Sequence, residues 1–570
     1  MTNRKSRKHQ WGWVESQKMV HSPGPATVII SLLVAVLWVA DGRAQSKPEN
    51  VQWWRDAKLG MFVHWGPVSL KGTEITCSRA ERPADFYGTS ETIPVEEYDN
   101  LYKQFNPTKF DAREWVRIAK AMGAGYIVFT TKHGDGFCEF DSKLTDYKIT
   151  NTPFKRDVTA ELANSCHECE MGLGFYYAPP DLHHPDFRTA YHQRYVEYMH
   201  GQIRELCTNY GKVDIIWFDS LPEQYPLWDS PQMFRIIRQL QPHALINNRG
   251  GLLGDFDTPE QEVGKFQSAR PWESCITIGE QWSYKPDDKL KSVQECVQTL
   301  VRCVCGDGNL LLNVGPMPTG EIEPRQVQRL TEIGRWLGHY GKAIYGTRGG
   351  PFVMGSRGGS TYKDEMIYLH ILDWPDDVLR LPAIGARIVS SRPLTGGAVD
   401  IRQGESGIEV FVPEKERDPI DTIIVLKLDK PASQVEPVRC YLSLTMHKQV
   451  TASSSGEDTP DYCCVPQYTV DDDFLTRWQA GVGVRQAWLE VDLGAPTTFD
   501  RAFISEEYDR VREFELQYRD GDNWRVLARG TTIGKKLSRS FRPVTARFVR
   551  LNILKATDSP SIWEFQLMAK

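Results

Sequence analysis

Short apolar runs and amphipathic segments alternate along residues 50–345 of this 570-residue chain. The run at 125–131 (GYIVFTT) is apolar on successive residues, as in a strand that is buried on both faces. The segment at 109–124 (KFDAREWVRIAKAMGA) instead spaces its apolar residues three and four apart, as an amphipathic helix does. By these criteria the sequence predicts strands at 59–66, 125–131, 172–179, 213–220, 244–249 and 309–316, and helices at 109–124, 157–171, 189–211, 230–242, 292–305 and 324–341.

Repeated strand–helix alternation favours an α/β fold with a parallel (β/α)8 barrel. A doubly wound sheet is the alternative, but no glycine-rich dinucleotide fingerprint follows the early strands. Polar residues lie at or just past the ends of five predicted strands: His64, Lys132 with His133, Tyr177, Asp219 and Arg249. In a barrel these strand ends meet on one face, where active sites are built. We therefore expect a TIM-like barrel over residues 45–348 that carries the functional site.

The helical pattern stops after residues 343–352 (AIYGTRGGPF). Residues 349–437 alternate as short strands separated by turn-forming stretches, which predicts a small β-sandwich. A second strand-rich segment, 438–570, predicts a further C-terminal β-sandwich.

The N-terminus begins with a basic leader, which is followed by the apolar stretch 26–40 (ATVIISLLVAVLWVA). This stretch is short for a membrane span but suits the core of a signal peptide, and small residues follow it. We expect residues 1–44 to be a signal peptide cut after Ala44, with export to a periplasm, the extracellular space or a lysosomal-type lumen and no membrane span in the mature protein. An uncleaved N-terminal anchor is the alternative.

The composition indicates which classes of binding partner the protein has. The formal charge of −6 gives no basic footprint for nucleic acid, and 17 Trp residues fit a protein that handles carbohydrate. Cys166 and Cys169 (CHEC) have the spacing of a metal or redox motif, but they lie in a predicted helix and no second CxxC follows. We expect structural or free thiols there, and no metal or organic cofactor.

Asp219 closes the apolar run of residues 211–220 (GKVDIIWFDS). An ionised carboxylate is costly to desolvate, so this residue either caps the next turn or is held there for chemistry. The convergence of polar residues at the neighbouring strand ends favours chemistry.

These residues occur within stretches that resemble glycoside hydrolase family 29, the α-L-fucosidases. The stretches, in the order of that family, are LGMFVHWGPVS (59–69), TKHGDGFCEFDS (131–142), GFYYAP (174–179), IIWFDS (215–220), INNRGG (246–251), FDTPEQ (256–261), WESC with QWSY (272–284) and GNLLLNVGPMPTG (308–320). Residues 438–570 resemble a discoidin-like (F5/8 type C) β-sandwich, a type found in carbohydrate-binding modules.

The resemblance implies a retaining α-L-fucosidase that hydrolyses terminal fucosyl linkages of a fucosylated glycan or fucan, and the predicted signal peptide adds that it is secreted. Such a hydrolase uses two carboxyl groups about 5–5.5 Å apart, one as nucleophile and one as acid/base. Asp219 matches the nucleophile. Glu260 resembles the acid/base, and Glu273 is the alternative because some members lack the first motif.

The resemblance also implies a set of substrate-binding residues. Five positions match residues that bind the fucose hydroxyls and ring oxygen or support the nucleophile: His64, His133, Tyr177, Trp217 and Arg249. Trp65 and Trp282 are expected either to pack against the methyl side of the sugar or to belong to the core. Glu74 corresponds to a loop glutamate of the family.

Two departures leave the exact sugar and linkage open. Gly134 stands where the family has a second consecutive histidine, so one hydroxyl contact is lost or supplied by another group. The loop at 72–86 also differs, and its Arg79 and Arg82 could contact an anionic substituent such as a sulfate. A glycosidase for a related or sulfated 6-deoxy sugar, and a catalytically degenerate carbohydrate-binding protein, are the alternative functions. The sequence carries no signal for oligomeric state.

Overall fold

The computed structural model describes residues 48–569 except 81–92, 265, 356, 375–376, 406, 440–442, 458–463, 473–475 and 536. The predicted signal peptide and Arg82 lie outside the described residues.

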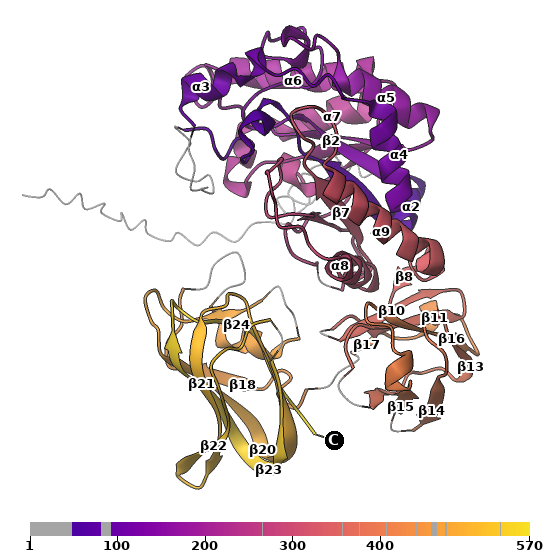
Figure 1. The fold of residues 1–570 in the computed structure, drawn as a ribbon, viewed down its shortest axis with the longest axis vertical. Helices are drawn as coiled ribbons and strands as arrows, with labels where there is room; N and C mark the ends of the chain where they lie inside the picture. The colour runs from indigo at the N-terminus through magenta and orange to yellow at the C-terminus, as the bar shows by residue number, and fades with distance from the viewer. Residues whose placement is uncertain are drawn as a thin grey trace, which may run out of the picture. The chain divides into compact units, whose positions relative to one another are not determined.

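A seven-stranded parallel sheet forms the centre of the N-terminal part of the described chain (Figure 1). Its strands occur in the spatial order β5-β4-β3-β2-β1-β7-β6. Their bounds are β1 Leu59–Val63, β2 Tyr126–Lys132, β3 Gly172–Tyr177, β4 Ile215–Phe218, β5 Leu245–Ile246, β6 Glu273–Thr277 and β7 Asn309–Val314.

Segment 256–260 fills the place between the two edge strands. It does so through three isolated parallel bridges: Asn247 with Phe256, Asp257 with Trp272, and Glu260 with Cys275. Together with the seven strands, this irregular segment gives the arrangement of a (β/α)8-like barrel, which confirms the predicted fold class.

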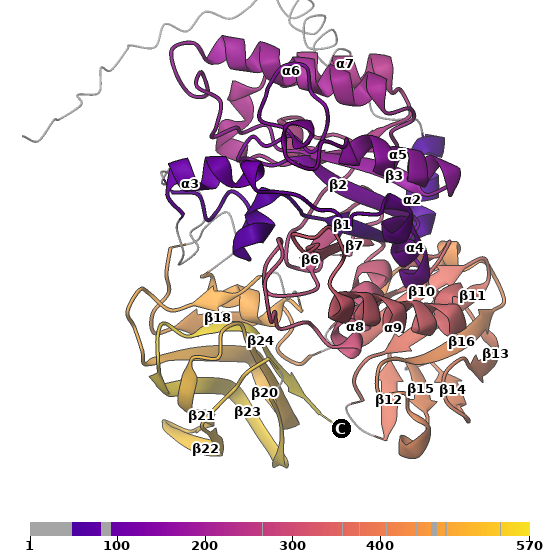
Figure 2. The ribbon, with the colours of Figure 1, turned by 45° about the horizontal axis from the view of Figure 1, so that its top comes forward.

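Helices cover the outside of the sheet (Figure 2). Their bounds are α2 Pro48–Ala57, α3 Val95–Asn100, α4 Ala112–Met122, α5 Val158–Glu168, α6 His192–Asn209, α7 Ser230–Leu240, α8 Val293–Cys305 and α9 Pro324–Tyr340. Local signals fix their ends. The Asp111 carboxylate caps α4 by accepting hydrogen bonds from the Arg113 and Glu114 N–H groups. Ser292 and Glu295 form a capping box at the start of α8.

Two apolar layers follow from the alternation of side chains along each strand. The inner layer fills the barrel and includes Phe62, Tyr126, Tyr176 and Trp217. The outer layer lies between the strands and the helices. The sequence pattern missed strand β6, because three of its five residues (ESCIT) are polar and it contains no long apolar run, although all of them are buried.

Antiparallel sheets follow the barrel. One has the order β13-β16-β11-β10-β8, a second has the order β12-β15-β14, and a parallel pair joins β17 to β9. The bounds are β8 Arg348–Gly349, β9 Phe352–Val353, β10 Gly358–Lys363, β11 Met366–Ile371, β12 Val378–Leu381, β13 Ile388–Pro393, β14 Asp400–Gly404, β15 Gly407–Phe411, β16 Thr422–Leu428 and β17 Val438–Arg439. The sheets enclose a core of their own.

The C-terminal sheet has the order β19-β24-β20-β23-β21-β22, with β18 paired to β20. The bounds are β18 Gln449–Ala452, β19 Trp478–Gln479, β20 Ala487–Glu506, β21 Val511–Asp520, β22 Asn523–Gly530, β23 Leu537–Ala556 and β24 Ser561–Met568. Its inward residues form a separate apolar core.

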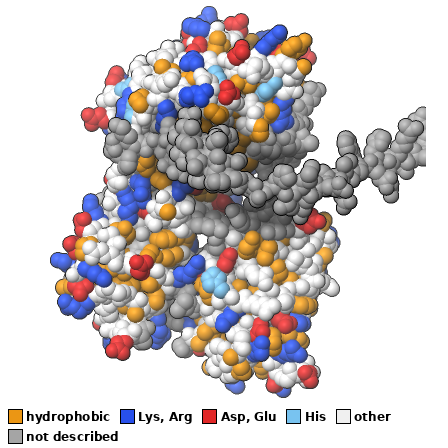
Figure 3. All heavy atoms as spheres, turned by 180° about the vertical axis from the view of Figure 1, so that it is seen from behind, with side chains coloured by type: hydrophobic (Ala, Val, Ile, Leu, Met, Phe, Trp, Pro, Cys, Tyr) orange, Lys and Arg blue, Asp and Glu red, His pale blue; other side chains and the backbone are white. Residues whose placement is uncertain are grey.

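The described residues also bear on the cysteines, the membrane and the surface. Cys166 and Cys169 are free thiols, and Cys464 is disulfide-bonded. Within the described ranges we find no group of three metal-ligating side chains and no helix with the length and apolar character to span a bilayer. On the face drawn in Figure 3, basic and acidic side chains are interspersed.

Trp65 belongs to the outer layer and not to the active site. Its side chain is 1% exposed. The indole packs against Phe105, Phe110 and Trp115 at centroid distances of 5.1, 5.8 and 5.3 Å, and its Nε1–H donates to the Met317 carbonyl oxygen at 3.0 Å. Of the two alternatives expected for Trp65, the structure therefore favours core packing, because its side chain lies in the outer layer.

Trp65→Ala should lower the free energy of unfolding by about 3–5 kcal/mol, since it leaves a large cavity in a packed layer. Denaturant unfolding measures this loss. Tyr191→Ala is the matched control, because Tyr191 is 57% exposed and its removal should change stability by less than about 0.5 kcal/mol. Equal stability of the two variants would contradict the core assignment.

Candidate active site

Asp219 lies directly after β4 at the carboxyl end of the barrel. Its Oδ1 accepts a hydrogen bond from Arg249 Nη1 at 3.0 Å, and its Oδ2 accepts one from the Tyr176 hydroxyl at 2.8 Å. Burial by itself raises the pKa of Asp219, but the positive charge of Arg249, the nearby His133 and these two hydrogen bonds together lower it below its ordinary value. The carboxylate is thus held ionised while its side chain stays 33% exposed.

Arg249 is locked in place by contacts on every side. Its Nε donates to Thr258 Oγ1 at 2.9 Å and its Nη2 to the Thr258 carbonyl oxygen at 2.7 Å. The guanidinium lies over the Trp217 ring, 5.0 Å from its centroid. Because Nε, Nη2 and the flat face of the guanidinium are all in contact, its Nη1 is held in a fixed direction.

The same Arg249 nitrogen also holds Glu260. Nη1 donates to Glu260 Oε2 at 2.6 Å, besides its 3.0 Å contact to Asp219 Oδ1. These two contacts placed end to end limit the separation of the two carboxylate oxygens to about 5.6 Å, which is compatible with the separation of a retaining pair. The Glu260 side chain is 42% exposed, so solvent reaches it.

Glu273, the alternative acid/base, lies inside the barrel. Its side chain is fully buried. Oε2 accepts a hydrogen bond from the Tyr126 hydroxyl, and Oε1 accepts one from Trp217 Nε1 at 3.3 Å. Burial raises the pKa of Glu273 to about 7. Both oxygens of this carboxyl group are therefore engaged by side chains of the inner layer.

His64, after β1, is oriented by a two-step hydrogen-bond relay. Asn313 Nδ2 donates to the Trp282 carbonyl oxygen at 2.8 Å, which turns the Asn313 amide oxygen toward His64 Nδ1 at 2.7 Å. Burial, together with the nearby His133, lowers the pKa of His64 to about 3, so the ring is neutral. Nδ1 therefore carries the proton and Nε2 offers a lone pair that can accept a hydrogen bond from a hydroxyl group.

His133, after β2, lies beside the nucleophile. It stacks on Tyr176 with a centroid distance of 5.3 Å and an interplanar angle of 12°. Its Nδ1 lies 2.5 Å from Thr76 Oγ1. Burial lowers the pKa of His133 to about 4 even though the negative charge of Asp219 opposes this shift. The ring is therefore a neutral hydrogen-bonding group.

The structure places Tyr176, and not Tyr177, at the site. Tyr176 belongs to the inner layer, stacks on Trp217 at 5.6 Å and donates to Asp219. Tyr177 faces the outer layer, where its hydroxyl donates to Gln202 Oε1 at 2.7 Å. Successive residues of a strand point to opposite sides, so the prediction was displaced by one residue.

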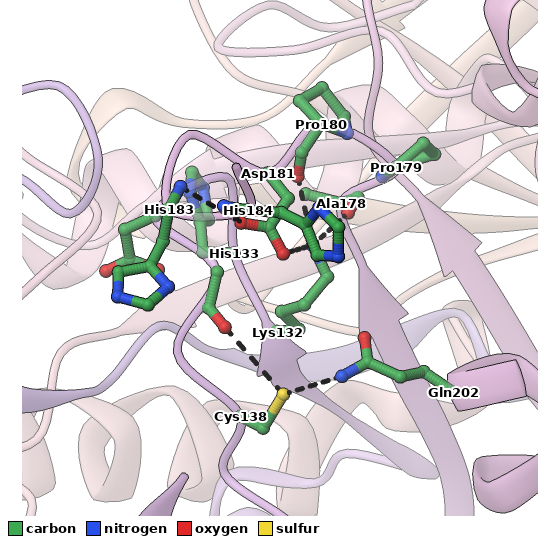
Figure 4. Close-up of polar contacts among 12 residues, drawn as sticks. Lys132, His133, Cys138, Ala178, Pro179, Pro180, Asp181, His183, His184 and Gln202 are labelled. Atoms are coloured by element: carbon green, nitrogen blue, oxygen red, sulfur yellow. Dashed lines mark hydrogen bonds and ion pairs between the residues drawn. The ribbon is translucent and has the colours of Figure 1, made fainter. Parts of the chain in front are cut away.

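Lys132 ties the strand end that carries His133 to the loop after β3 (Figure 4). Its buried Nζ donates to the Ala178 and Pro180 carbonyl oxygens at 2.8 and 2.9 Å and lies 3.7 Å from Asp181. Asp181 Oδ1 in turn accepts from the His183 and His184 N–H groups at 3.0 and 2.9 Å. Lys132 therefore connects the end of β2 to the loop after β3, and its ammonium group contacts protein groups rather than a ligand position.

Glu74 and Trp282 lie together at the edge of the site. Glu74 is buried, and its carboxylate accepts hydrogen bonds from the Trp282 and Ser283 N–H groups at 2.8 and 3.0 Å. The half-buried Trp282 ring lies 4.9 Å from His64. Glu74 thus orders the loop that presents Trp282. Arg79 is engaged by Asp99 through two 2.8 Å hydrogen bonds, so it is not held ready for an anionic substituent.

Comparisons with known proteins identify related families. A family model described as alpha-L-fucosidase matches residues 40–342, and one described as F5/8 type C domain matches residues 449–565. Plasma alpha-L-fucosidase of Homo sapiens is 29% identical over 367 residues, which cover 57% of this chain and 76% of that protein. Tissue alpha-L-fucosidase of Bos taurus is 27% identical over 400 residues, covering 64% and 84%.

Solved structures show the same likeness. Alpha-L-fucosidase isoenzyme 1 from Paenibacillus thiaminolyticus has a TM-score of 0.61 and 35% identity, covering 67% of this chain and 99% of that one. A GH29 alpha-L-fucosidase from Bacteroides thetaiotaomicron, trapped as a covalent intermediate with 2-fluoro-fucosyl fluoride, has a TM-score of 0.59 and 27% identity, covering 68% and 97%.

Glu273→Gln should change how stability depends on pH. Because burial raises the folded-state pKa of Glu273 to about 7, the native state binds more protons than the unfolded state between the unfolded pKa and 7. Glu273 therefore makes the wild type lose stability as pH rises through this window, by an amount on the order of 3 kcal/mol. The variant should lack this loss.

Urea unfolding of both proteins from pH 4.5 to 8 measures the difference. Glu168→Gln, at a 58% exposed side chain, is the matched control and should run parallel to the wild type. If Glu273→Gln also runs parallel to it, the buried carboxyl is not protonated in the folded protein.

Proposed function

The chain belongs to glycoside hydrolase family 29, the α-L-fucosidases, and we propose that it hydrolyses terminal α-L-fucosyl linkages with retention of configuration. In this proposal Asp219 is the nucleophile and Glu260 is the acid/base. The observation that carries it is the single Arg249 nitrogen that contacts both carboxylates and limits their separation.

The first step joins the sugar to the protein. An Asp219 oxygen forms a bond to the anomeric carbon while the bond to the leaving oxygen breaks, and Glu260 gives its proton to that oxygen. In the second step Glu260 takes a proton from water. The water oxygen bonds to the anomeric carbon, and the ester bond to Asp219 breaks. Two inversions at one carbon give net retention.

The two environments fit these roles. Asp219 accepts hydrogen bonds from Arg249 and Tyr176, which support an anion at neutral pH. Glu260 is more exposed, so solvent can deliver the proton of the first step and the water of the second. We assign His64 Nε2 as an acceptor for a sugar hydroxyl, and His133 and Trp282 as further sugar contacts.

Variants of the carboxyl groups should fail in different ways. Glu260→Ala should slow hydrolysis of fucosides with poor leaving groups about 10²–10⁴-fold, because general acid assistance is lost, and it should affect an activated aryl fucoside much less. Azide should rescue the second step and give a product of retained configuration. Steady-state kinetics on a series of aryl α-L-fucosides, with NMR of the azide product, measures both effects.

Asp219→Gly tests the nucleophile, and Glu273→Ala tests the alternative acid/base. Asp219→Gly should abolish both steps, and azide should then give a product of inverted configuration. If the defect of Glu273→Ala depends on the leaving group and that of Glu260→Ala does not, the assignment of Glu260 is wrong.

We further propose that the protein is exported after removal of residues 1–44. The basic leader and the apolar stretch 26–40 support this. In a secreting host, Edman sequencing of the exported protein should begin at Gln45. Recovery of the protein only in the cytosol with Met1 retained would refute the export proposal without affecting the assigned reaction.

A further inference from the structure

Thr76 adopts a backbone conformation that is rare for its residue type. It is fully buried, and its φ of 58° lies in the left-handed region, which disfavours a β-branched side chain. Such a residue persists only where its surroundings over-determine it, and it commonly marks a functional site.

Both backbone polar groups of Thr76 are hydrogen-bonded to neighbouring residues. Its N–H donates to the Tyr98 hydroxyl oxygen at 2.9 Å, and its carbonyl oxygen accepts from the Arg79 N–H at 3.1 Å. The Tyr98 hydroxyl donates to Asp135 Oδ2 at 2.9 Å, and Asp135 lies two residues after His133. The chain around Thr76 is therefore fixed to the same β2 loop that carries His133.

The Thr76 hydroxyl is directed at His133. Oγ1 lies 2.5 Å from His133 Nδ1, at the edge of the imidazole ring. The Tyr176 ring stacks on the flat face of the same imidazole. The stack fixes the plane of the ring, and the hydrogen bond fixes its rotation within that plane. With Nδ1 engaged, Nε2 is the ring nitrogen left to meet a sugar hydroxyl.

The Thr76 methyl group lies next to the position where a side chain on residue 134 would begin. A Cβ atom on residue 134 would lie 3.2 Å from Thr76 Cγ2, which is tighter than an ordinary contact and would require a shift of a few tenths of an ångström, and 3.5 Å from Thr76 Oγ1, which is an ordinary contact. The backbone of Gly134 does not itself require glycine, since its φ is not in the positive range. Thr76 thus takes up the space beside His133 that a side chain at 134 would need.

We propose that Thr76 is a positioning residue for the hydrolytic reaction: its hydroxyl sets the rotation of His133 toward the sugar, and its methyl group crowds any side chain at 134. The proposal rests on the sugar-binding role given to His133 under the proposed function. It makes Thr76 and Gly134 one coupled pair, in which a change at either position acts through His133.

Two substitutions at Thr76 separate the hydroxyl from the shape. Thr76→Val keeps the branched shape and loses the hydroxyl, so kcat/KM on an activated aryl α-L-fucoside should fall about tenfold, the effect of one lost hydrogen bond. Thr76→Ser keeps the hydroxyl and should stay within about threefold of the wild type. A merely structural role predicts the reverse order, because valine preserves the packing and serine does not.

A double-mutant cycle tests the coupling. Gly134→Ala should lower kcat/KM about tenfold by pushing on Thr76, and the T76S/G134A double variant should recover the activity of Thr76→Ser, because serine lacks Cγ2. Thermal unfolding of every variant shows whether it is folded. If Thr76→Val does not fold, the Gly134→Ala cycle decides alone.

The outcomes are distinct from those that test the reaction itself. A wild type that does not cleave the aryl fucoside overturns the proposed function. An active wild type with an unimpaired Thr76→Val variant, or a Gly134→Ala defect that persists in the double variant, overturns the role of Thr76. A tenfold loss in Thr76→Val, retention in Thr76→Ser and recovery in the double variant support it.

Discussion

The positive charge of Arg249 is the element on which the geometry of the site depends. A guanidinium stays protonated throughout the physiological pH range and offers its donors in one rigid plane. Here Nε and Nη2 of Arg249 donate to Thr258, and its flat face lies over Trp217. Its Nη1 donates to Asp219 and Glu260. Without this cation, two carboxylates within about 5.6 Å would repel each other, and one of them would take up a proton.

The barrel produces this arrangement from chain segments that are neighbours in the sheet. Asp219 follows β4, Arg249 follows β5, and Glu260 closes the segment that lies between β5 and β6. Adjacent strands lie about 4.8 Å apart, so residues at successive strand ends are brought within reach of one long side chain. The spacing that a retaining mechanism needs is therefore close to a spacing that a parallel barrel supplies.

The sequence was sufficient for most buried strands of the barrel, with β6 as the exception, and for the position of Asp219, but not for the orientation of single side chains. Continuous apolar runs identified β2 and β4, and the polar residue after each run located His133 and Asp219. Tyr176 and Tyr177 are both aromatic and both buried, so composition carries no signal for which one faces the barrel interior. The pairing of Tyr176 with Trp217 across β3 and β4, which fixes that side, is a tertiary property. Thr76 was missed for a similar reason, because a positive φ in a β-branched residue contradicts its local preference.

Asp219, Glu260, Glu273 and Asp135, all in the barrel part of the chain, show how one kind of functional group acquires different states. Asp219 is held below its ordinary pKa because an arginine and a hydroxyl group favour its anion. Burial raises the pKa of Glu273 to about 7 and that of Asp135 to about 6, and these carboxyls are bound by Tyr126 and Tyr98 rather than by a cation. Glu260 is exposed and shares the arginine with Asp219. At Asp219 an opposite charge within contact distance thus outweighs desolvation, and this is the position where a permanent anion serves the chemistry. Below their pKa values, Glu273 and Asp135 are neutral hydrogen-bonding groups that support the aromatic rings and the loop around the sugar site. This division of roles depends on which carboxyl groups Arg249 contacts.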